Sequence, residues 1–279
     1  MGCHRNAAIN GNPAINDRFP ALRRKAACNQ SWYLNTKQPA GKTTMPKVSV
    51  DLTSETPYLE QDTAWHSFKR RLTYRAYLRM LSRHLPKNEP ISLLDVGTGS
   101  GYFLKTAKEW FPAASLFGVE YDPRLVEETL GRVPDGQIIQ GNAEEFGFGQ
   151  TRFDAIASFQ VIEHLYDPER MVATARNALK PGGLFLFTTP NLTGLGARVM
   201  KDRWTGYRDD HVSLKGMDEW IQLGVDGGFE PLYTGSTFFS GIPWLNKLPL
   251  GPINWALLLI LGTARWGHGE SFCGLFRKP

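Results

Sequence analysis

The sequence has few cysteines, and they follow no regular spacing. Only Cys3, Cys28 and Cys273 occur among 279 residues. A disulfide framework or a cysteine-rich zinc site needs more cysteines at closer, repeated intervals. Free thiols persist in a reducing compartment, so we expect a cytoplasmic protein that is not held together by disulfides.

Long hydrophobic runs are also absent. The longest uninterrupted apolar run, Trp255–Leu261, has seven residues, whereas a membrane-spanning helix needs about 20. It lies within an apolar insertion at residues 241–269, which also holds Trp244, Leu245 and Trp266. Two interpretations remain open. The insertion is a core helix or a cap over a substrate pocket, or it is a lid for a lipid-like substrate that makes peripheral contact with a membrane.

Acidic residues are nearly missing from the N-terminus. Residues 1–44 hold seven basic residues and one acid, a net charge of +6, so residues 45–279 carry −1 of the overall +5. The basic character therefore belongs to this extension and does not predict nucleic-acid binding. The extension shows no helical or strand period, and we expect it to be disordered. It is either a non-native extension with Met45 as the true start or a mitochondrial transit peptide.

The most informative pattern is a strand that runs into a glycine-rich turn and then a helix. The apolar run Ile91–Val96 carries Asp95, and Gly97, Gly99 and Gly101 follow it. Such a turn brings backbone N–H groups and a helix N-terminus to a ligand. Glycine allows close approach because it has no Cβ. The pattern predicts a site for a nucleotide-type cofactor.

The turn lacks the features of two common nucleotide sites. Tyr102 stands where the third glycine of the dinucleotide fingerprint belongs, and no G-K-[ST] follows as in nucleotide hydrolases. Asp95 just before the first glycine suits a cationic ligand better than a pyrophosphate. S-adenosylmethionine carries a sulfonium and an ammonium and no phosphate, and Asp95 is a candidate partner for the ammonium.

The remaining strands alternate with helical segments. A second strand ends at Glu120, about 20 residues after the glycines, where a carboxylate binds ribose hydroxyls in such folds. Later strands are expected at 137–142, 153–158 and 184–188. A helix is expected over 168–179 and a turn over 180–183. This alternation predicts an α/β fold with a parallel sheet between helices.

In this order the blocks resemble class I S-adenosylmethionine-dependent methyltransferases, and most closely the small-molecule branch that includes ubiquinone-pathway O-methyltransferases. The blocks are DVGTGSGYF, GVEYDP, QGNAEEF, FDAIASFQVIEHLYDP, ALKPGGLFLFTTPN, DDHVSL, GGFEP and GESFCGLFRKP. The resemblance implies a Rossmann-like, mostly parallel sheet of seven strands with helices on both faces. Its last strand, near residues 271–276, would be antiparallel. The implied cofactor site comprises Asp95, Gly97, Thr98, Gly99, Gly101, Glu120, Tyr121, Asn142, Ala143 and Gln160.

One position departs from the ubiquinone branch. That branch has a block similar to E-x-x-E-H, whose acids and histidine are associated with a divalent metal. Here Gln160 replaces the first acid, which leaves Glu163 and His164. Because a neutral amide is a poor ligand for a hard cation, we expect no metal site.

The sequence indicates less clearly which residues would bind the molecule that accepts the methyl group. His164 and His211 are the candidates for a general base, because histidine titrates near neutral pH. A structural role for either is the alternative. A helical segment at residues 45–90 precedes the methyltransferase domain, 91–279. Within it, a helix expected over 62–85 carries arginines at every fourth position, 71 to 83, on one face. That face is either solvated or docks an anionic surface.

The sequence thus predicts an S-adenosylmethionine-dependent methyltransferase that acts on a small molecule and has no nucleic-acid partner. A lipid-like molecule is one class of acceptor that the apolar insertion would suit. Two alternatives remain. One is a non-catalytic S-adenosylmethionine-binding interaction module. The other is an NAD-dependent dehydrogenase, which the glycine spacing opposes.

Overall fold

The strands of the described part of the chain form a single sheet. The computed structural model describes residues 64–237, 250–253, 256 and 262–279, and these belong to one compact unit, Gln61–Pro279. The 1–44 extension and most of the 241–269 insertion lie outside the described residues. No helix among the described residues is long and apolar enough to cross a membrane.

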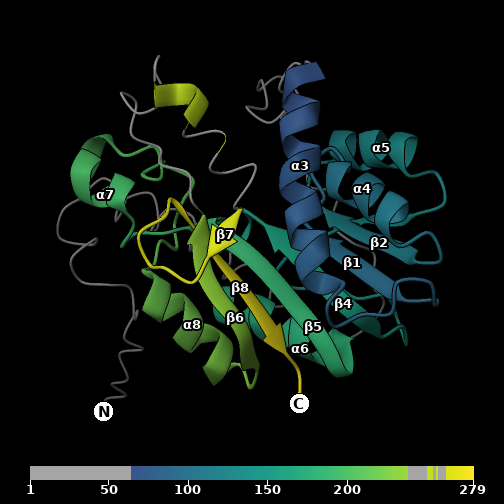
Figure 1. The fold of residues 1–279 in the computed structure, drawn as a ribbon. Helices are drawn as coiled ribbons and strands as arrows, with labels where there is room; N and C mark the ends of the chain where they lie inside the picture. The colour runs from purple at the N-terminus through teal and green to yellow at the C-terminus, as the bar shows by residue number, and fades with distance from the viewer. Residues whose placement is uncertain (1–63, 238–249, 254–255, 257–261) are drawn as a thin grey trace, which may run out of the picture. The chain divides into compact units, whose positions relative to one another are not determined.

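Helices and strands alternate along the first two thirds of this unit (Figure 1). The helices are α3 (Ala64–Leu81), α4 (Tyr102–Trp110), α5 (Pro123–Arg132), α6 (Pro168–Ala178), α7 (Leu195–Met200) and α8 (Met217–Asp226), with short 3-10 turns η2 (Ile162–His164) and η3 (Lys201–Arg203). The strands are β1 (Ser92–Val96), β2 (Ser115–Glu120), β3 (Gln137–Gln140), β4 (Phe153–Phe159), β5 (Leu179–Pro190), β6 (Glu230–Thr237), β7 (Thr263–Ala264) and β8 (Ser271–Arg277).

The strand order is β3-β2-β1-β4-β5-β8-β6-β7. The first five strands are parallel, and β8 runs antiparallel between β5 and β6. The predicted fold class is confirmed, including the antiparallel last strand. The two-residue β7, which comes from within the 241–269 insertion, adds an eighth strand beside β6.

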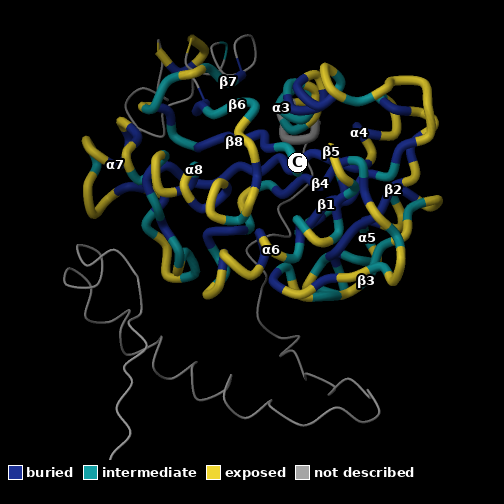
Figure 2. The backbone as a smooth tube through the Cα atoms, turned by 90° about the horizontal axis from the view of Figure 1, so that it is seen from below, coloured by how far each residue is buried: buried dark blue, intermediate teal, exposed yellow. Residues whose placement is uncertain are grey.

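Hydrophobic residues cover both faces of the sheet. On β1, Leu93 joins the core under α3 and α4, and the next residue, Leu94, joins the core under α6 and α8. Neighbouring strand residues point to opposite faces, so a strand buried on both sides is mostly apolar, and the buried Asp95 of β1 is an exception. Figure 2 shows the central strands as mostly buried and the outer loops and helix surfaces as largely exposed.

Two Asp-Pro pairs begin helices after strand ends. Asp122 accepts a hydrogen bond from the N–H of Arg124 at the start of α5, and Asp167 accepts one from Arg170 at the start of α6. In both helices the proline occupies the first turn, where no backbone N–H donor is needed. These local signals determine where each helix begins after the carboxyl end of the preceding strand.

Several element boundaries differ from the prediction: the helix expected to reach residue 85 ends at Leu81, the strand expected to reach residue 142 ends at Gln140, and the largest difference is at β5. The helix expected to reach Leu179 ends at Ala178, and the segment predicted as a turn, 180–183, is an irregular beginning of β5. Gly182 adopts a positive φ of 76°, and its N–H donates to the carbonyl of Lys278 after β8. The antiparallel partner β8 therefore extends the strand through a sequence that looks like a turn.

Candidate cofactor and acceptor sites

The glycine turn has the backbone conformation that its sequence predicts. Gly97, Gly99 and Gly101 have φ values of 79°, 51° and 77°. A Cβ on Gly97 would stand 2.3 Å from Val161 Cγ2, and one on Gly101 would stand 2.9 Å from Thr129 Cγ2. Both positions need glycine for its conformation and for space. The turn ends at the N-terminus of α4, which leaves N–H groups directed at the site.

Glu120 ends β2 next to this turn. Its carboxylate accepts hydrogen bonds from the N–H groups of Gly99 (2.8 Å), Tyr121 (2.8 Å) and Asp122 (3.1 Å). These bonds hold the carboxylate at the carboxyl end of the strand, where ribose hydroxyls bind in such folds. The structure therefore joins Glu120 to the glycine turn, as the sequence predicts.

Asp95 is the least satisfied polar group of this region. Its side chain is 1% exposed, and its Oδ1 has no hydrogen-bond partner among the described residues. Burial, and next the charge of Glu120, raise the pKa of Asp95 well above its ordinary value. A buried carboxyl group without a partner is costly, and a cation would satisfy it. This orphaned oxygen fits an ammonium group.

The other predicted cofactor residues lie at the same edge with differing roles. Thr98 is buried, and its N–H donates to Val119. Tyr121 is exposed, and Ala143 is half-buried. Asn142 is exposed, and its side chain accepts the N–H of Glu144. Gln160 follows β4 with a positive φ of 57°.

The conformation of Gln160 is unusual for a residue with a side chain. Its N–H donates to the carbonyl of Thr188, and its side-chain amide lies 3.3 Å from the Thr188 hydroxyl. Non-glycine residues in this region of backbone space cluster at functional sites. Here the strain directs the chain from β4 into η2 at the predicted cofactor site.

Sequence reasoning did not assign a role to Tyr74. Its ring packs against Phe103 and Phe159, at centroid distances of 5.5 and 5.3 Å. Burial, and next the charge of Asp95, raise the pKa of Tyr74 to about 12. Helix α3 thus places a neutral phenol near the buried carboxyl group. The regular spacing of aromatic residues on α3 was the available signal, but it does not reveal which strand end they cover.

The structure brings the two candidate histidines together. The rings of His164 and His211 lie 4.7 Å apart and are nearly perpendicular. His164 Nδ1 is 3.0 Å from the Asp210 carbonyl oxygen, and His211 Nδ1 is 2.8 Å from that of Gly206. Because a carbonyl only accepts, each Nδ1 must carry the proton. Each Nε2 is then a lone-pair acceptor.

Both histidines favour the neutral form. Burial is the largest cause that lowers the pKa of His164, and the Asp210 carboxylate partly opposes it. Burial also lowers the pKa of His211, which a hydrogen bond to the Gly206 carbonyl partly opposes. A neutral imidazole with its proton on Nδ1 carries a lone pair on Nε2, and this is the form that accepts a proton.

Glu163 completes this cluster. It is fully buried, its Oε2 accepts the Thr189 hydroxyl at 3.0 Å, and its Oε1 has no partner among the described residues. Burial raises its pKa to about 8. One ligand atom each from Glu163, His164 and His211 lie within 4.8 Å of one another, which is close enough to hold one metal ion. The expectation of no metal site therefore stays a prediction to be tested.

Replacing Glu163 by glutamine is expected to make the protein more stable at alkaline pH. An unfolded chain loses this proton near the ordinary value of 4.5, whereas the folded protein keeps it to about 8. The unfolded state thus binds fewer protons between these values, and stability falls as the pH rises through that window. Glutamine mimics the protonated acid and removes this contribution. Melting temperatures across a pH series would show it. Parallel curves for Glu163→Gln and wild type would contradict it.

Comparisons with known proteins decide the family. The model of a methyltransferase domain matches residues 65–234, more than half of the chain. The chain belongs to the S-adenosylmethionine-dependent methyltransferase family. This assignment confirms the resemblance found in the sequence and S-adenosylmethionine as the cofactor.

Individual relatives are distant. The chain is 28% identical over 193 residues to a probable S-adenosylmethionine-dependent methyltransferase of Mycobacterium tuberculosis, covering 68% of this chain and 65% of that protein. It is 33% identical over 178 residues to a ubiquinone biosynthesis O-methyltransferase of Cereibacter sphaeroides, covering 60% and 70%. The match to the mycobacterial relative thus spans just under two thirds of that protein's length.

A solved structure supports the fold. Phosphoethanolamine N-methyltransferase 2 of Haemonchus contortus, in complex with S-adenosyl-L-methionine, matches with a TM-score of 0.56 and 19% identity. The match covers 79% of this methyltransferase chain and 58% of the other. At this identity the likeness concerns the fold.

Proposed function

We propose that this methyltransferase transfers a methyl group from S-adenosylmethionine to a small-molecule acceptor. The observation that carries the proposal is the buried, unpartnered oxygen of Asp95 beside the glycine turn and Glu120. A cationic cofactor with a ribose satisfies both carboxyl groups. A phosphate-bearing cofactor would instead bring more negative charge to Asp95.

The residues of the chain perform binding and proton transfer. Asp95 takes the ammonium, Glu120 takes the ribose hydroxyls, and the positive-φ turn lets the backbone approach the ligand. When bound, S-adenosylmethionine supplies an electrophilic methyl group that moves in line to the acceptor atom. Most of the rate enhancement would come from holding the two reacting atoms in that alignment.

We infer that the acceptor atom is a hydroxyl oxygen and that one of the paired histidines removes its proton. The loop from residue 206 to residue 213 is fastened to η2, because the Ser213 N–H donates to Glu163 O and the Ser213 hydroxyl donates to Leu165 O. The two imidazoles are thus held beside η2, at the carboxyl edge of the sheet. This is where ligands bind in open α/β folds.

A lipid-like acceptor is the finer proposal. Its support is the apolar sequence of the 241–269 insertion and the exposure of Leu250 (43%) and Ile253 (57%), which belong to its described residues. The insertion would serve as a lid and as a peripheral membrane contact. A screen of metabolites and lipid extracts for release of S-adenosylhomocysteine tests this acceptor class. Release with polar metabolites alone would contradict it.

Chelation should leave turnover intact. Gln160 stands where the ubiquinone branch has an acid, and its side-chain N–H donates a hydrogen bond to the Thr188 hydroxyl. We therefore expect turnover to proceed without an ion on Glu163, His164 and His211. Activity measured before and after EDTA treatment tests this. Loss of activity that magnesium or zinc restores would show that the cluster binds a required metal.

A further inference from the structure

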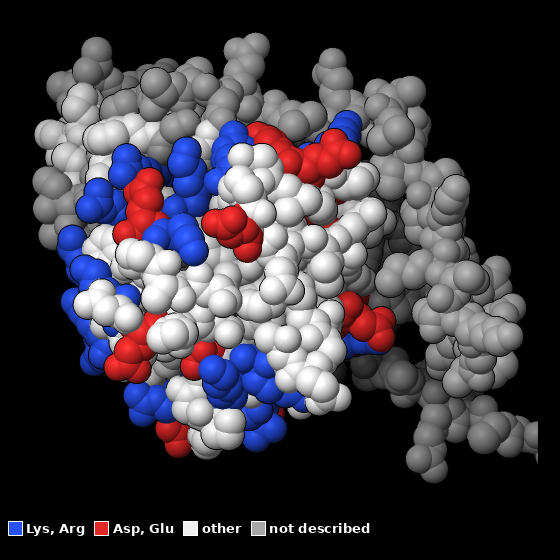
Figure 3. Space-filling view, turned by 90° about the vertical axis from the view of Figure 1, so that its right-hand side faces the viewer, with Lys and Arg blue, Asp and Glu red and all other residues white. Residues whose placement is uncertain are grey.

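Positive charge is concentrated on the α3 segment. Residues 64–90 contain seven basic residues and one acid, whereas residues 91–279 carry a net charge of −4. Residues 91–279 are thus weakly acidic, whereas the segment that precedes them is strongly basic. Figure 3 shows blue Lys and Arg side chains along the left margin of the face it draws and a second group at its lower centre.

Four of these arginines form a row along α3 and the turn that follows it. Arg71, Arg75, Arg79 and Arg83 are all exposed, and the opposite side of the helix buries Tyr77, Leu78 and Leu81 in the core. Twelve residues at about 1.5 Å each give the row a length of about 18 Å. We call these four residues the arginine row.

The arginine row is largely unneutralised. Arg71 pairs with Glu109 at 2.7 Å. Arg75, Arg79 and Arg83 have no carboxylate partner within the described ranges. Arg75 lies 5.7 Å from the centre of the Trp110 ring, and Lys87 lies 5.5 Å from the same ring. Like charges held along one helix face repel each other, so an anionic partner would be stabilising.

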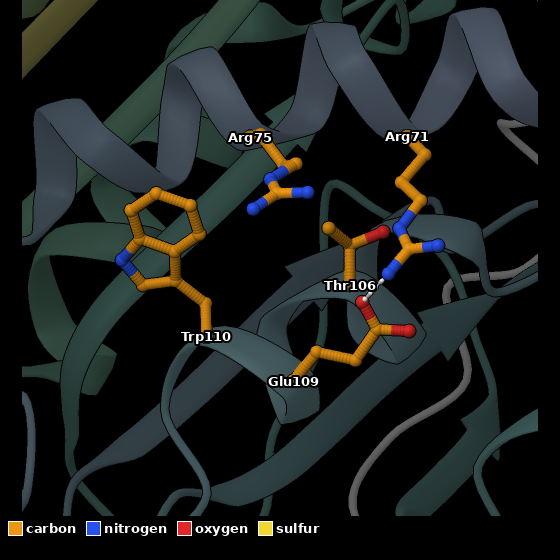
Figure 4. A pocket seen from close by; sticks show the side chains of 5 residues that line it. All are labelled: Arg71, Arg75, Thr106, Glu109 and Trp110. Carbon is orange, nitrogen blue, oxygen red and sulfur yellow. Dashed lines mark hydrogen bonds and ion pairs between the residues drawn. The ribbon is translucent and has the colours of Figure 1, made fainter.

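A groove lies beside the row, between α3 and α4. Its volume is about 340 Å³, and its lining residues are Arg71, Arg75, Thr106, Glu109 and Trp110. Figure 4 shows the two arginines reaching from α3 toward α4, with the Arg71–Glu109 pair at one end and Trp110 at the other. The guanidinium of Arg75 is thus placed to meet an anion entering the groove.

Apolar groups adjoin the basic surface. Phe68 stands one turn before the row on the same helix face and is 50% exposed. Basic residues next to aromatic and aliphatic ones are typical of surfaces that bind at a membrane interface.

We propose that the arginine row, with Phe68 and the α3–α4 groove, docks the protein on an anionic phospholipid surface. A protein partner fits less well, because a stable protein interface has an apolar core. Phe68 is the sole large hydrophobic side chain that α3 exposes among its described positions. The inference deepens the proposed function and rests on it only for the lipid-like acceptor, which docking would bring within reach.

Vesicle binding tests the docking directly. The full-length protein is mixed with vesicles of phosphatidylcholine alone or with added phosphatidylglycerol, and the bound fraction is measured by sedimentation. We expect binding to the anionic vesicles alone, and its loss at high salt. Each basic side chain near such a surface increases the binding affinity by a factor of about five. The double variant Arg75→Gln with Arg79→Gln should therefore bind the anionic vesicles about 25-fold more weakly.

The control variant removes the same charge elsewhere. Arg152 and Arg198 are exposed and lie outside α3, and their replacement by glutamine should weaken binding far less. Melting temperature and S-adenosylmethionine affinity should be unchanged in both double variants, which separates docking from methyl transfer. Equal losses in the two variants, or no binding to anionic vesicles, would overturn the proposal. So would displacement by free glycerol phosphate, which would indicate a small-anion site, or binding to polyglutamate but not to vesicles, which would indicate an acidic protein partner.

Discussion

Replacing Asp95 by asparagine is expected to weaken S-adenosylmethionine binding by roughly 10- to 150-fold. The substitution keeps the shape of the side chain and removes its charge. A hydrogen bond to a charged group contributes about 1.5–3 kcal/mol, and each 1.4 kcal/mol is a factor of ten in affinity. Asp95 is buried with an unpartnered oxygen, so little solvent screening reduces this effect.

The same group should make cofactor binding depend on pH. The pKa of Asp95 is raised in the free protein, mainly by burial. An ammonium group favours the ionised form, so binding must release the proton wherever the free protein carries it. Affinity should therefore increase as the pH rises through that pKa and then level off. Calorimetry in buffers of different ionisation enthalpy would detect the released proton.

A matched control is available for this experiment. Asp135 is exposed in the loop before β3, and Asp135→Asn should bind the cofactor as the wild type does. The affinity of Glu120→Gln should fall as well, because Glu120 holds the ribose side of the site. If Asp95→Asn kept the affinity and pH dependence of the wild type, Asp95 would not contact the cofactor.

Replacing His164 or His211 by asparagine should lower turnover by roughly 10²- to 10⁴-fold for whichever residue is the base. Asparagine places its side-chain N–H near the position of histidine Nδ1. It can therefore keep the bond to Asp210 O or Gly206 O while Nε2 is lost. The cofactor affinity should stay nearly unchanged, because the Nδ1 hydrogen bonds of both histidines go to the loop at Gly206 and Asp210.

The pH profile separates catalysis from structure. The pKa of both histidines is lowered, chiefly by burial, so the neutral base is present above that lowered value. Turnover should rise with pH and reach a plateau once the histidine is neutral. His84, exposed after α3, serves as a control, and His84→Ala should keep the wild-type profile. Near-normal turnover in both asparagine variants would show that histidine does not remove the proton.

Local patterns predicted the cofactor side of the fold well, and for a physical reason. Gly97 and Gly101 mark positions where a Cβ would collide, and Asp122-Pro123 marks a helix start. Strand ends carry Asp95 and Glu120, and parallel strands bring their ends to one edge of the sheet. Each of these features could be predicted from residues close together in the sequence and from the rule that parallel strands end at the same edge of a sheet.

The acceptor side could not be predicted in the same way. His164 and His211 are both visible in the sequence, but their contact depends on a loop fastened to η2 by the N–H and hydroxyl of Ser213. Tyr74 nears Asp95 because α3 packs over the end of β4, where its ring meets Phe159. The neutral state of Glu163 follows from complete burial, which no local pattern reveals.

Titration calorimetry with unlabelled ligands tests the central claim most directly. The wild-type protein is titrated with S-adenosylmethionine, with S-adenosylhomocysteine and with NAD under identical conditions. The geometry at Asp95, Glu120 and the glycine turn predicts saturable binding of the first two and none of NAD. Saturable binding of NAD without binding of S-adenosylmethionine would contradict it.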